Sequence, residues 1–256
     1  ISIVVWGLEA VFPWRKDQPL FRKDFWLDVF YMFFNFFLLN LIVLIALSNS
    51  AAEIFNDLLG LVGISISSFQ LLEINKLPFA ARILLFFIVV DFTQWWTHRL
   101  LHRFEFLWNF HKVHHSVKQM GFAAHLRYHW MEPIIYNSLR YIPLAIIGGF
   151  SAQDVAFVHF FAITIGHLNH ANVNLNYGFL KYILNNPKMH IWHHAKELPE
   201  DRKYGVNFAL TLSIWDYLFK TNYIPYSGKN IEIGFDDDEK FPKSFFKQGI
   251  YPLGKK

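Results

Sequence analysis

The stretch Asp91–His115, DFTQWWTHRLLHRFEFLWNFHKVHH, joins the end of an apolar segment to two groups of closely spaced histidines. His98 and His102 are four residues apart, and a second group, His111, His114 and His115, follows. Because residues three and four apart share one face of a helix, each group can direct two or three imidazoles toward one point. The stretch therefore predicts helices that present nitrogen ligands where a membrane span ends.

Two more histidine groups occur later in the chain, so that the four groups hold ten of the thirteen histidines. Neutral imidazole is the commonest side-chain metal ligand, and sites made only of nitrogen suit Zn, Cu, Fe or Ni better than Mg or Ca. Ten donors are too many for one tetrahedral ion but suit two metals of higher coordination. We therefore expect a dimetal site whose candidate ligands are His98, His102, His111, His114, His115, His167, His170, His190, His193 and His194.

The composition favours a membrane protein. Hydrophobic residues make up 54% of the 256 residues and charged residues 17%, whereas soluble domains carry about 25% charge. The chain has no cysteine, which excludes disulfides, cysteine-ligated zinc, iron–sulfur clusters and a thiol nucleophile. The net charge of +4 comes without an aromatic-basic recognition motif, so we expect no nucleic-acid partner.

Four apolar stretches are candidates for membrane spans, each near the roughly 20 residues that a spanning helix needs. Ile1–Phe12 resembles the tail of a further helix whose beginning is missing. We expect an all-α integral membrane protein of one domain, 1–256, with about four transmembrane helices, a cytosolic helical cap around the dimetal site and a polar C-terminal tail at 222–256. The expected spans are 25–48, 79–97, 134–150 and 152–168.

The four histidine groups can share one site only if they lie on one side of the membrane. The chain between His115 and His167 must then leave and return, and the two later apolar stretches supply that hairpin. Lys and Arg flank the histidine groups, whereas the connection Asn49–Pro78 carries only Lys76 against three acidic residues. The positive-inside rule therefore places the site on the cytosolic side.

Local signals predict where two helices begin and which residue contacts one of the candidate histidine ligands. Ser151 and Asp154 form a capping box pattern, and Asn186 followed by Pro187 is a typical helix start. Asp91 lies seven residues before His98 within an apolar span, where an unpaired carboxylate is costly. We expect Asp91 to accept a hydrogen bond from His98 or His102, with a contact to Gln94 as the alternative.

The order of these motifs resembles the fatty acid hydroxylase / sterol desaturase superfamily, in its bacterial and alkylglycerol monooxygenase-like branch. The resemblance covers about Glu9 to Thr221, and Trp130 stands where that family usually has Pro. The matching elements are Trp95-Trp96-x-His98-Arg99, His111-Lys-x-His114-His115-Ser116, Arg127-Tyr-His129-x-x-Glu132, Asn185-x-Pro187-x-x-His190-x-x-His193-His194, Lys203-Tyr204-Gly205 and Ile214-Trp215-Asp216-x-x-Phe219.

The resemblance implies a non-haem di-iron centre that uses O2 to oxidise an unactivated C–H bond of a lipid. It implies that the histidines of the boxes are the ligands, completed by His170 and by His167, and that Arg127, His129 and Glu132 lie near them. Their roles, helix packing or a contact from Glu132 to a ligand, stay open. Because no cofactor-binding motif for electron transfer is present, electrons must come from a separate reductase or another reductant.

Several questions stay open at this point. Desaturation shares the first hydrogen abstraction with hydroxylation, and the boxes do not separate the two; the later motifs favour hydroxylation. Three other classes of protein fit the histidine groups less well. A metal transporter would place its ligands near the bilayer midplane, whereas these groups lie at or just beyond the ends of the expected spans. A zinc hydrolase needs only three protein ligands, and a scaffold needs none. The substrate lipid, the electron donor and the oligomeric state are not determined. The resemblance favours a bacterial inner membrane over the endoplasmic reticulum.

Overall fold

A computed structural model describes residues 1–36, 53–54, 56–65, 68 and 70–253. These residues form helices and contain no β-strand, only three isolated bridges, which agrees with the expected all-helical class. The α-helices are α1 (Ser2–Val11), α2 (Phe25–Phe33), α4 (Phe79–Arg103), α5 (Glu105–His115), α6 (Met131–Ile147), α7 (Ala152–His170), α8 (Pro187–His193), α9 (Ile214–Leu218) and α10 (Phe245–Gly249). The short 3-10 helices are η3 (Ile74–Lys76), η4 (Phe122–Leu126), η5 (Gly178–Tyr182), η6 (Glu200–Arg202) and η7 (Asp238–Lys240).

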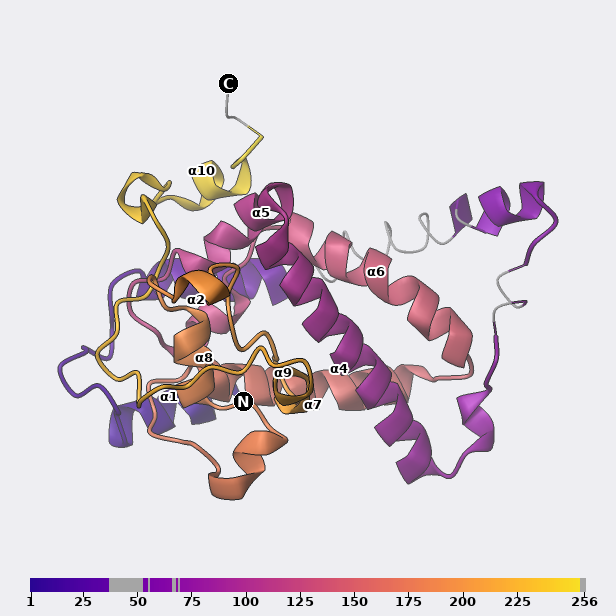
Figure 1. The fold of residues 1–256 in the computed structure, drawn as a ribbon, viewed down its shortest axis with the longest axis horizontal. Helices are drawn as coiled ribbons and strands as arrows, with labels where there is room; N and C mark the ends of the chain where they lie inside the picture. Colours follow the sequence, from indigo (N-terminus) through magenta and orange to yellow (C-terminus); the bar gives the residue numbers. More distant parts are fainter. Residues whose placement is uncertain (37–52, 55, 66–67, 69, 254–256) are drawn as a thin grey trace.

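The long helix α4 organises the fold and contacts α5, α6 and α7 (Figure 1). It begins directly after Pro78 and ends at Arg103, because Phe104 has an extended backbone. α5 starts at the next residue, so the chain folds back at once. This turn brings the histidines at the end of α4 opposite those of α5.

One helix of the described residues, α4, is long and apolar enough to cross a membrane. The expected span 79–97 falls within it. The expected spans 134–150 and 152–168 correspond to α6 and α7, which are helical but do not reach the same length and hydropathy. Of the expected span 25–48, residues 25–36 are helical and the others lie outside the described residues. Four transmembrane helices are therefore not shown.

The predicted capping box at the start of α7 is present. The Ser151 side chain accepts from the Asp154 backbone N–H, and the Asp154 carboxylate accepts from the Ser151 N–H. Asp154 is buried and also pairs with Arg82 at 3.0 Å. This pair fixes the beginning of α7 against the first turn of α4.

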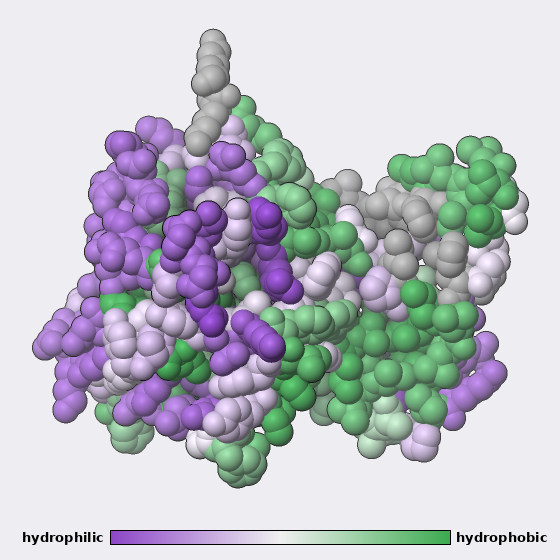
Figure 2. All heavy atoms as spheres, viewed as in Figure 1, coloured by the Kyte–Doolittle hydropathy of each residue, from purple (hydrophilic) through white to green (hydrophobic). Residues whose placement is uncertain are grey.

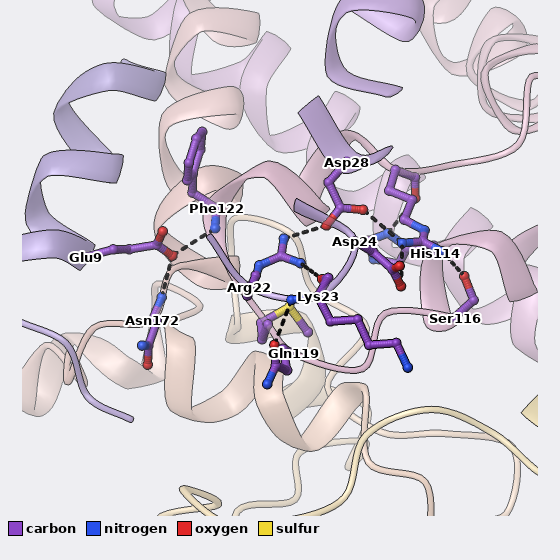
Figure 3. Close-up of polar contacts among 12 residues, drawn as sticks. Glu9, Arg22, Lys23, Asp24, Asp28, His114, Ser116, Gln119, Phe122 and Asn172 are labelled. Carbon is purple, nitrogen blue, oxygen red and sulfur yellow. Dashed lines mark hydrogen bonds and ion pairs between the residues drawn. The ribbon is translucent and has the colours of Figure 1, made fainter. Parts of the chain in front are cut away.

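A buried carboxylate connects α1 to the middle of the chain. The Glu9 side chain accepts hydrogen bonds from the backbone N–H groups of Phe122 and Asn172, at 2.9 and 2.7 Å (Figure 3). Val5 of the same helix packs in one apolar cluster with Phe122. The apolar N-terminal segment is thus packed against η4 and against the chain after α7.

The C-terminal segment packs against α2 and α5. Phe235 and Phe241 share an apolar cluster with Tyr31 of α2 and Val113 of α5. The Tyr31 hydroxyl also donates to the side chain of Gln248 at 2.9 Å. The segment after residue 222, which we expected to be a polar tail, therefore covers α2 and α5.

Apolar side chains gather toward one end of the face drawn in Figure 2, and hydrophilic side chains toward the other. Figure 2 shows apolar residues over α6 and the first half of α4, and hydrophilic residues over the C-terminal segments at the other end. Large apolar side chains are exposed on both α4 and α7, including Phe79, Leu84, Phe157 and Phe160. Exposed apolar surface of this extent is typical of a surface that contacts a membrane or a partner.

Candidate metal centre

Nine buried or nearly buried histidines converge into two groups, and within each group the candidate ligand atoms lie within 4.8 Å of one another. The five-histidine group takes its residues from α4, α5 and α8. The four-histidine group takes its residues from α5, α7, α8 and the position directly after α8. The five-histidine group is His98, His102, His111, His115 and His193. The four-histidine group is His114, His170, His190 and His194.

Helix geometry explains why single sequence motifs are divided between the two groups. His111 and His115 are four residues apart on α5 and share one face, while His114 projects toward the other group. The short helix α8 divides its histidines in the same way. It starts as expected, because the Asn186 side chain accepts from the backbone N–H groups of Lys188 and Met189.

Five of the nine imidazoles are oriented by an oxygen acceptor at Nδ1. Four of these acceptors are backbone carbonyls, which can only accept, so Nδ1 carries the proton and Nε2 keeps a lone pair. The four pairs are His98 with Phe208 at 2.6 Å, His114 with Arg127 at 3.1 Å, His170 with Gly166 at 2.7 Å and His193 with Val206 at 2.9 Å. The fifth acceptor is the Glu132 carboxylate, 2.8 Å from Nδ1 of His111.

This orientation leaves lone pairs facing each other inside the groups. Nε2 of His114 and Nε2 of His170 are 3.3 Å apart, and both rings already donate from Nδ1 to carbonyls. Two acceptor nitrogens cannot hydrogen-bond to each other, so a cation between them is needed to make the contact favourable. The donor set fits a metal ion held by imidazole.

Burial keeps these imidazoles neutral. Desolvation lowers the pKa of His111 to about 3. Burial, together with repulsion from neighbouring histidines, also lowers the pKa values of His114 and His190 well below the usual value of histidine. Neutral imidazole is the form that binds metal, so the groups are ready for metal at neutral pH.

We expect acid to destabilise the protein after metal is removed by a chelator. The unfolded state binds protons near pH 6.5, while folded His111 resists protonation down to about pH 3. The stabilising effect of the neutral form is therefore complete above pH 6.5 and is lost as pH falls. Below about pH 6.5, each histidine of this kind lowers the free energy of unfolding by about 1.4 kcal/mol for every pH unit of acidification. The measurement is the thermal unfolding midpoint of the metal-free chain between pH 7.5 and pH 5.5; an unchanged midpoint contradicts the prediction.

Asp91 does not contact a histidine in the structure. Its carboxylate accepts from the backbone N–H of Leu212 at 3.1 Å and from the Trp215 indole N–H at 2.9 Å. The reason is geometric, since seven residues of α4 separate Asp91 from His98 by about 10 Å along the helix axis. Asp91 instead fixes the segment around α9 against α4.

Asp216 is a supporting residue for which sequence reasoning gave no role. Its buried carboxylate accepts from the Trp95 indole N–H at 3.0 Å and from the backbone N–H of Phe208 at 3.0 Å. The Phe208 carbonyl in turn holds Nδ1 of His98. The only sign of Asp216 in the sequence was its place in the Trp215-Asp216 motif. Its support of His98 through Phe208 depends on contacts between distant segments.

Arg127 acts on the four-histidine group through its backbone. Its carbonyl accepts from His114, and its guanidinium donates to Asp28 at 3.0 Å and to the Ser116 hydroxyl at 2.8 Å. Asp28 also pairs with Arg22, so one buried carboxylate lies between two guanidinium groups beside His114 (Figure 3). This network fixes the backbone that orients His114.

His129 lies close to the site without joining either group. Its Nδ1 accepts from the backbone N–H of Met131 at 3.1 Å, and its Nε2 faces the Gly249 carbonyl at 2.9 Å. Glu132 accepts from the His129 backbone N–H at 3.2 Å while it contacts His111 with its other oxygen. Two roles were left open for Glu132, helix packing and a contact to a ligand. The structure shows the contact, because Glu132 accepts from the candidate ligand His111.

His167 is a candidate ligand that the structure places outside both groups. Its Nδ1 is 2.8 Å from Nδ1 of His125, and its Nε2 is 3.0 Å from the Ser2 hydroxyl. His125, which the sequence left outside the histidine groups, lies between His167 and His170. A β-carbon at Gly166 would collide with the His125 ring, so the glycine leaves space for it.

A cavity of about 280 Å³ extends from the histidine groups between α4, α6 and α7. His98, His111, His114, His170 and His190 line its inner end. Apolar residues line the other end, among them Phe86, Leu144 and Val158. The wall also carries Tyr136 and Arg140 of α6 and His159 of α7, an exposed residue. The cavity can hold an apolar chain with one end at the histidines.

Comparisons with known proteins agree with this geometry. The family model described as fatty acid hydroxylase matches residues 83–221. The chain is 33% identical over 184 residues to "Ornithine lipid hydroxylase OlsE" of Rhizobium tropici, over 71% of this chain and 53% of that protein. It is 34% identical over 139 residues to "Alkylglycerol monooxygenase" of Homo sapiens, over 53% of this chain and 29% of that protein.

A third relative, "Very-long-chain aldehyde decarbonylase GL1-10" of Oryza sativa subsp. japonica, is 28% identical over 173 residues. That match takes in 63% of this chain and 54% of the relative, so the chain spans about half or less of the curated proteins that it matches. No solved structure matches the chain. The family match covers more than half of the chain and includes all nine grouped histidines. The chain therefore belongs to the fatty acid hydroxylase family.

Proposed function

We propose that this chain is an O2-dependent di-iron oxidoreductase that hydroxylates an unactivated C–H bond of a lipid. The observation that carries the proposal is the pair of histidine groups with facing Nε2 lone pairs at the end of an apolar cavity. The relatives whose names denote a lipid hydroxylase and an alkylglycerol monooxygenase support the lipid substrate.

The two groups would each hold one iron ion. Their nine imidazoles supply only nitrogen donors, which suit iron, and no thiolate competes because the chain has no cysteine. Bound iron supplies the chemistry that side chains lack, namely activation of O2 and abstraction of hydrogen from an alkyl carbon. We keep His167 out of this ligand set and propose that it supports His125 instead.

The protein residues then have distinct tasks. Backbone carbonyls and the Glu132 carboxylate accept hydrogen bonds from the Nδ1 atoms of the histidines. These bonds fix the ring orientation, and therefore the direction in which the Nε2 atom of each of these rings points. The apolar wall formed by Phe86, Leu144 and Val158 excludes water and binds the hydrocarbon. Hydroxylation consumes one O2, two electrons and two protons for each oxygen atom inserted and releases one water, so the protein needs an external reductase or reductant.

Desaturation is the second candidate for the same site. The same cavity and histidine groups would serve a reaction that removes two hydrogens from the lipid instead of inserting oxygen. We place the working protein in a membrane, as a multi-pass protein with the site on the cytosolic side, and favour the bacterial inner membrane. Membrane contact is supported by α4, the candidate span among the described residues, and by the exposed apolar residues of α7.

The test combines metal analysis with product analysis. The detergent-purified chain from iron-replete cells should contain about two irons, and the lipids of those cells, supplied with isotopically labelled O2, should gain one labelled oxygen atom. A product that lacks two hydrogens and carries no label would favour desaturation. One zinc per chain, or no metal, with no change in the lipids would overturn the proposal.

A further inference from the structure

Arg140 lies in the wall of the cavity, midway along α6. Glu132, Tyr136 and Arg140 follow one another at four-residue spacing, so they share one face of the helix, and all three line the cavity. Glu132 contacts His111 at 2.8 Å. Arg140 therefore lies about 12 Å from Glu132 along the helix axis, farther from the histidines but in the same space.

The positive charge of Arg140 has no counter-ion in the described part of the chain. Its Nε atom is buried and makes no hydrogen bond, and none of the observed ion pairs includes it. The residues outside the described part contain no Asp or Glu. By contrast, Arg22 and Arg127 share Asp28, and Arg82 pairs with Asp154.

An unpaired guanidinium in an apolar helix is costly, and such a residue commonly marks a functional site. The planar guanidinium donates two parallel hydrogen bonds to a carboxylate or a phosphate, which match its geometry. Tyr136 is one turn away on the same face and His159 lines the cavity from α7, so further donors are nearby. His159 is exposed, so part of the cavity wall faces the outside of the protein.

We propose that Arg140 binds the anionic group, a carboxylate or a phosphate ester, of the lipid that occupies this cavity. This inference rests on the proposed function, because it takes the occupant of the cavity to be the lipid substrate. The hydrocarbon then runs from Arg140 toward the histidine groups, past the roughly 12 Å of α6 that separates Arg140 from Glu132. Arg140 thereby selects anionic lipids and sets which carbon reaches the metals.

The test measures binding of three probes with the same hydrocarbon chain, namely hexadecanoate, hexadecyl phosphate and hexadecanol. Retention of each radiolabelled probe is measured on the full chain, immobilised in a non-ionic detergent. We expect at least one anion to bind the wild-type chain more tightly than the alcohol, and the stronger anion identifies the head group. Arg140→Gln should weaken binding of that anion by about tenfold to a hundredfold and leave the alcohol unchanged, while Arg140→Lys should retain part of the preference.

Two control variants locate the binding. Arg103→Gln removes an exposed arginine that packs over Tyr204 outside the cavity, and it should bind all three probes as the wild type does. Ala162→Phe fills the cavity from α7 and should weaken all three probes. Thermal unfolding midpoints close to that of the wild type show that the variants are folded. Anion binding that survives in Ala162→Phe would place it on the outer surface and overturn the proposal.

A last variant separates this inference from the proposed function. The double variant His114→Ala, His193→Ala removes one candidate ligand from each group, and it should keep the preference for the anion. An anion preference that survives in Arg140→Gln but is lost in the double variant would assign the anion to the metal site and overturn the inference. Absence of iron in the wild type would overturn the proposed function, whereas the effect of Arg140→Gln on binding would still stand.

Discussion

The double variant His114→Ala, His193→Ala is expected to lose both metal ions and all lipid oxidation. Each substitution removes a nitrogen donor from a different group, since Nε2 of His114 faces Nε2 of His170 and Nε2 of His193 faces Nε2 of His115. Loss of a residue that merely orients a ligand costs about 10- to 100-fold in metal affinity or activity, so direct loss of a ligand should exceed a hundredfold. Metal content by elemental mass spectrometry and product formation in the same cells are the measurements.

The matched control is His129→Gln. His129 is a buried histidine close to α5, but it contacts the Gly249 carbonyl and belongs to neither group. Its replacement should leave the metal content at the wild-type level. If the double variant kept its iron, the two histidine groups would not be the metal site, and a shared loss in both proteins would point to a folding defect instead.

Asp28→Ala is expected to lower the free energy of unfolding by about 3–5 kcal/mol. The Asp28 side chain is fully buried between Arg22 and Arg127. Its removal leaves the buried Arg22 guanidinium without its carboxylate and leaves Arg127 with only the longer contact to Asp24, at 3.8 Å. Because the Arg127 carbonyl orients His114, we also expect weaker metal binding in the four-histidine group. Thermal unfolding of the detergent-purified protein, with metal content measured in parallel, is the test.

Asp201→Ala serves as the comparison for this change. The Asp201 side chain is 77% exposed, and its pair with Arg202 spans 3.7 Å. A surface ion pair of this kind contributes about 0–1 kcal/mol, so its loss should scarcely move the midpoint. Equal midpoints for the two variants would show that the Asp28 network does not hold the fold.

Short-range rules of helix geometry were sufficient to predict much of the site. Spacings of three and four residues placed the histidines on shared helix faces, and Asn186 with Pro187 fixed the start of α8. The capping box at Ser151 followed from the same local chemistry. These features depend on neighbours within one or two turns, which the sequence contains directly.

Contacts between distant segments were the part that the sequence could not supply. Asp91 was expected beside a histidine, but its partners come from residues 212 and 215, more than a hundred positions later. Asp216 reaches the Phe208 backbone that holds His98, and His125 pairs with His167. Each contact requires two segments to meet in space, which hydrophobic periodicity does not specify.

The sequence by itself determined that the chain is helical, rich in apolar segments and equipped with histidines for a metal site, because composition and helical spacing are local properties. Only the tertiary structure divided nine histidines into groups of five and four and left His167 beside them. It also placed Arg140 in the cavity that leads to these groups, without a counter-ion among the residues that the structure describes. Such assignments depend on how α4, α5, α6, α7 and α8 pack, and packing decides which side chains share one small volume.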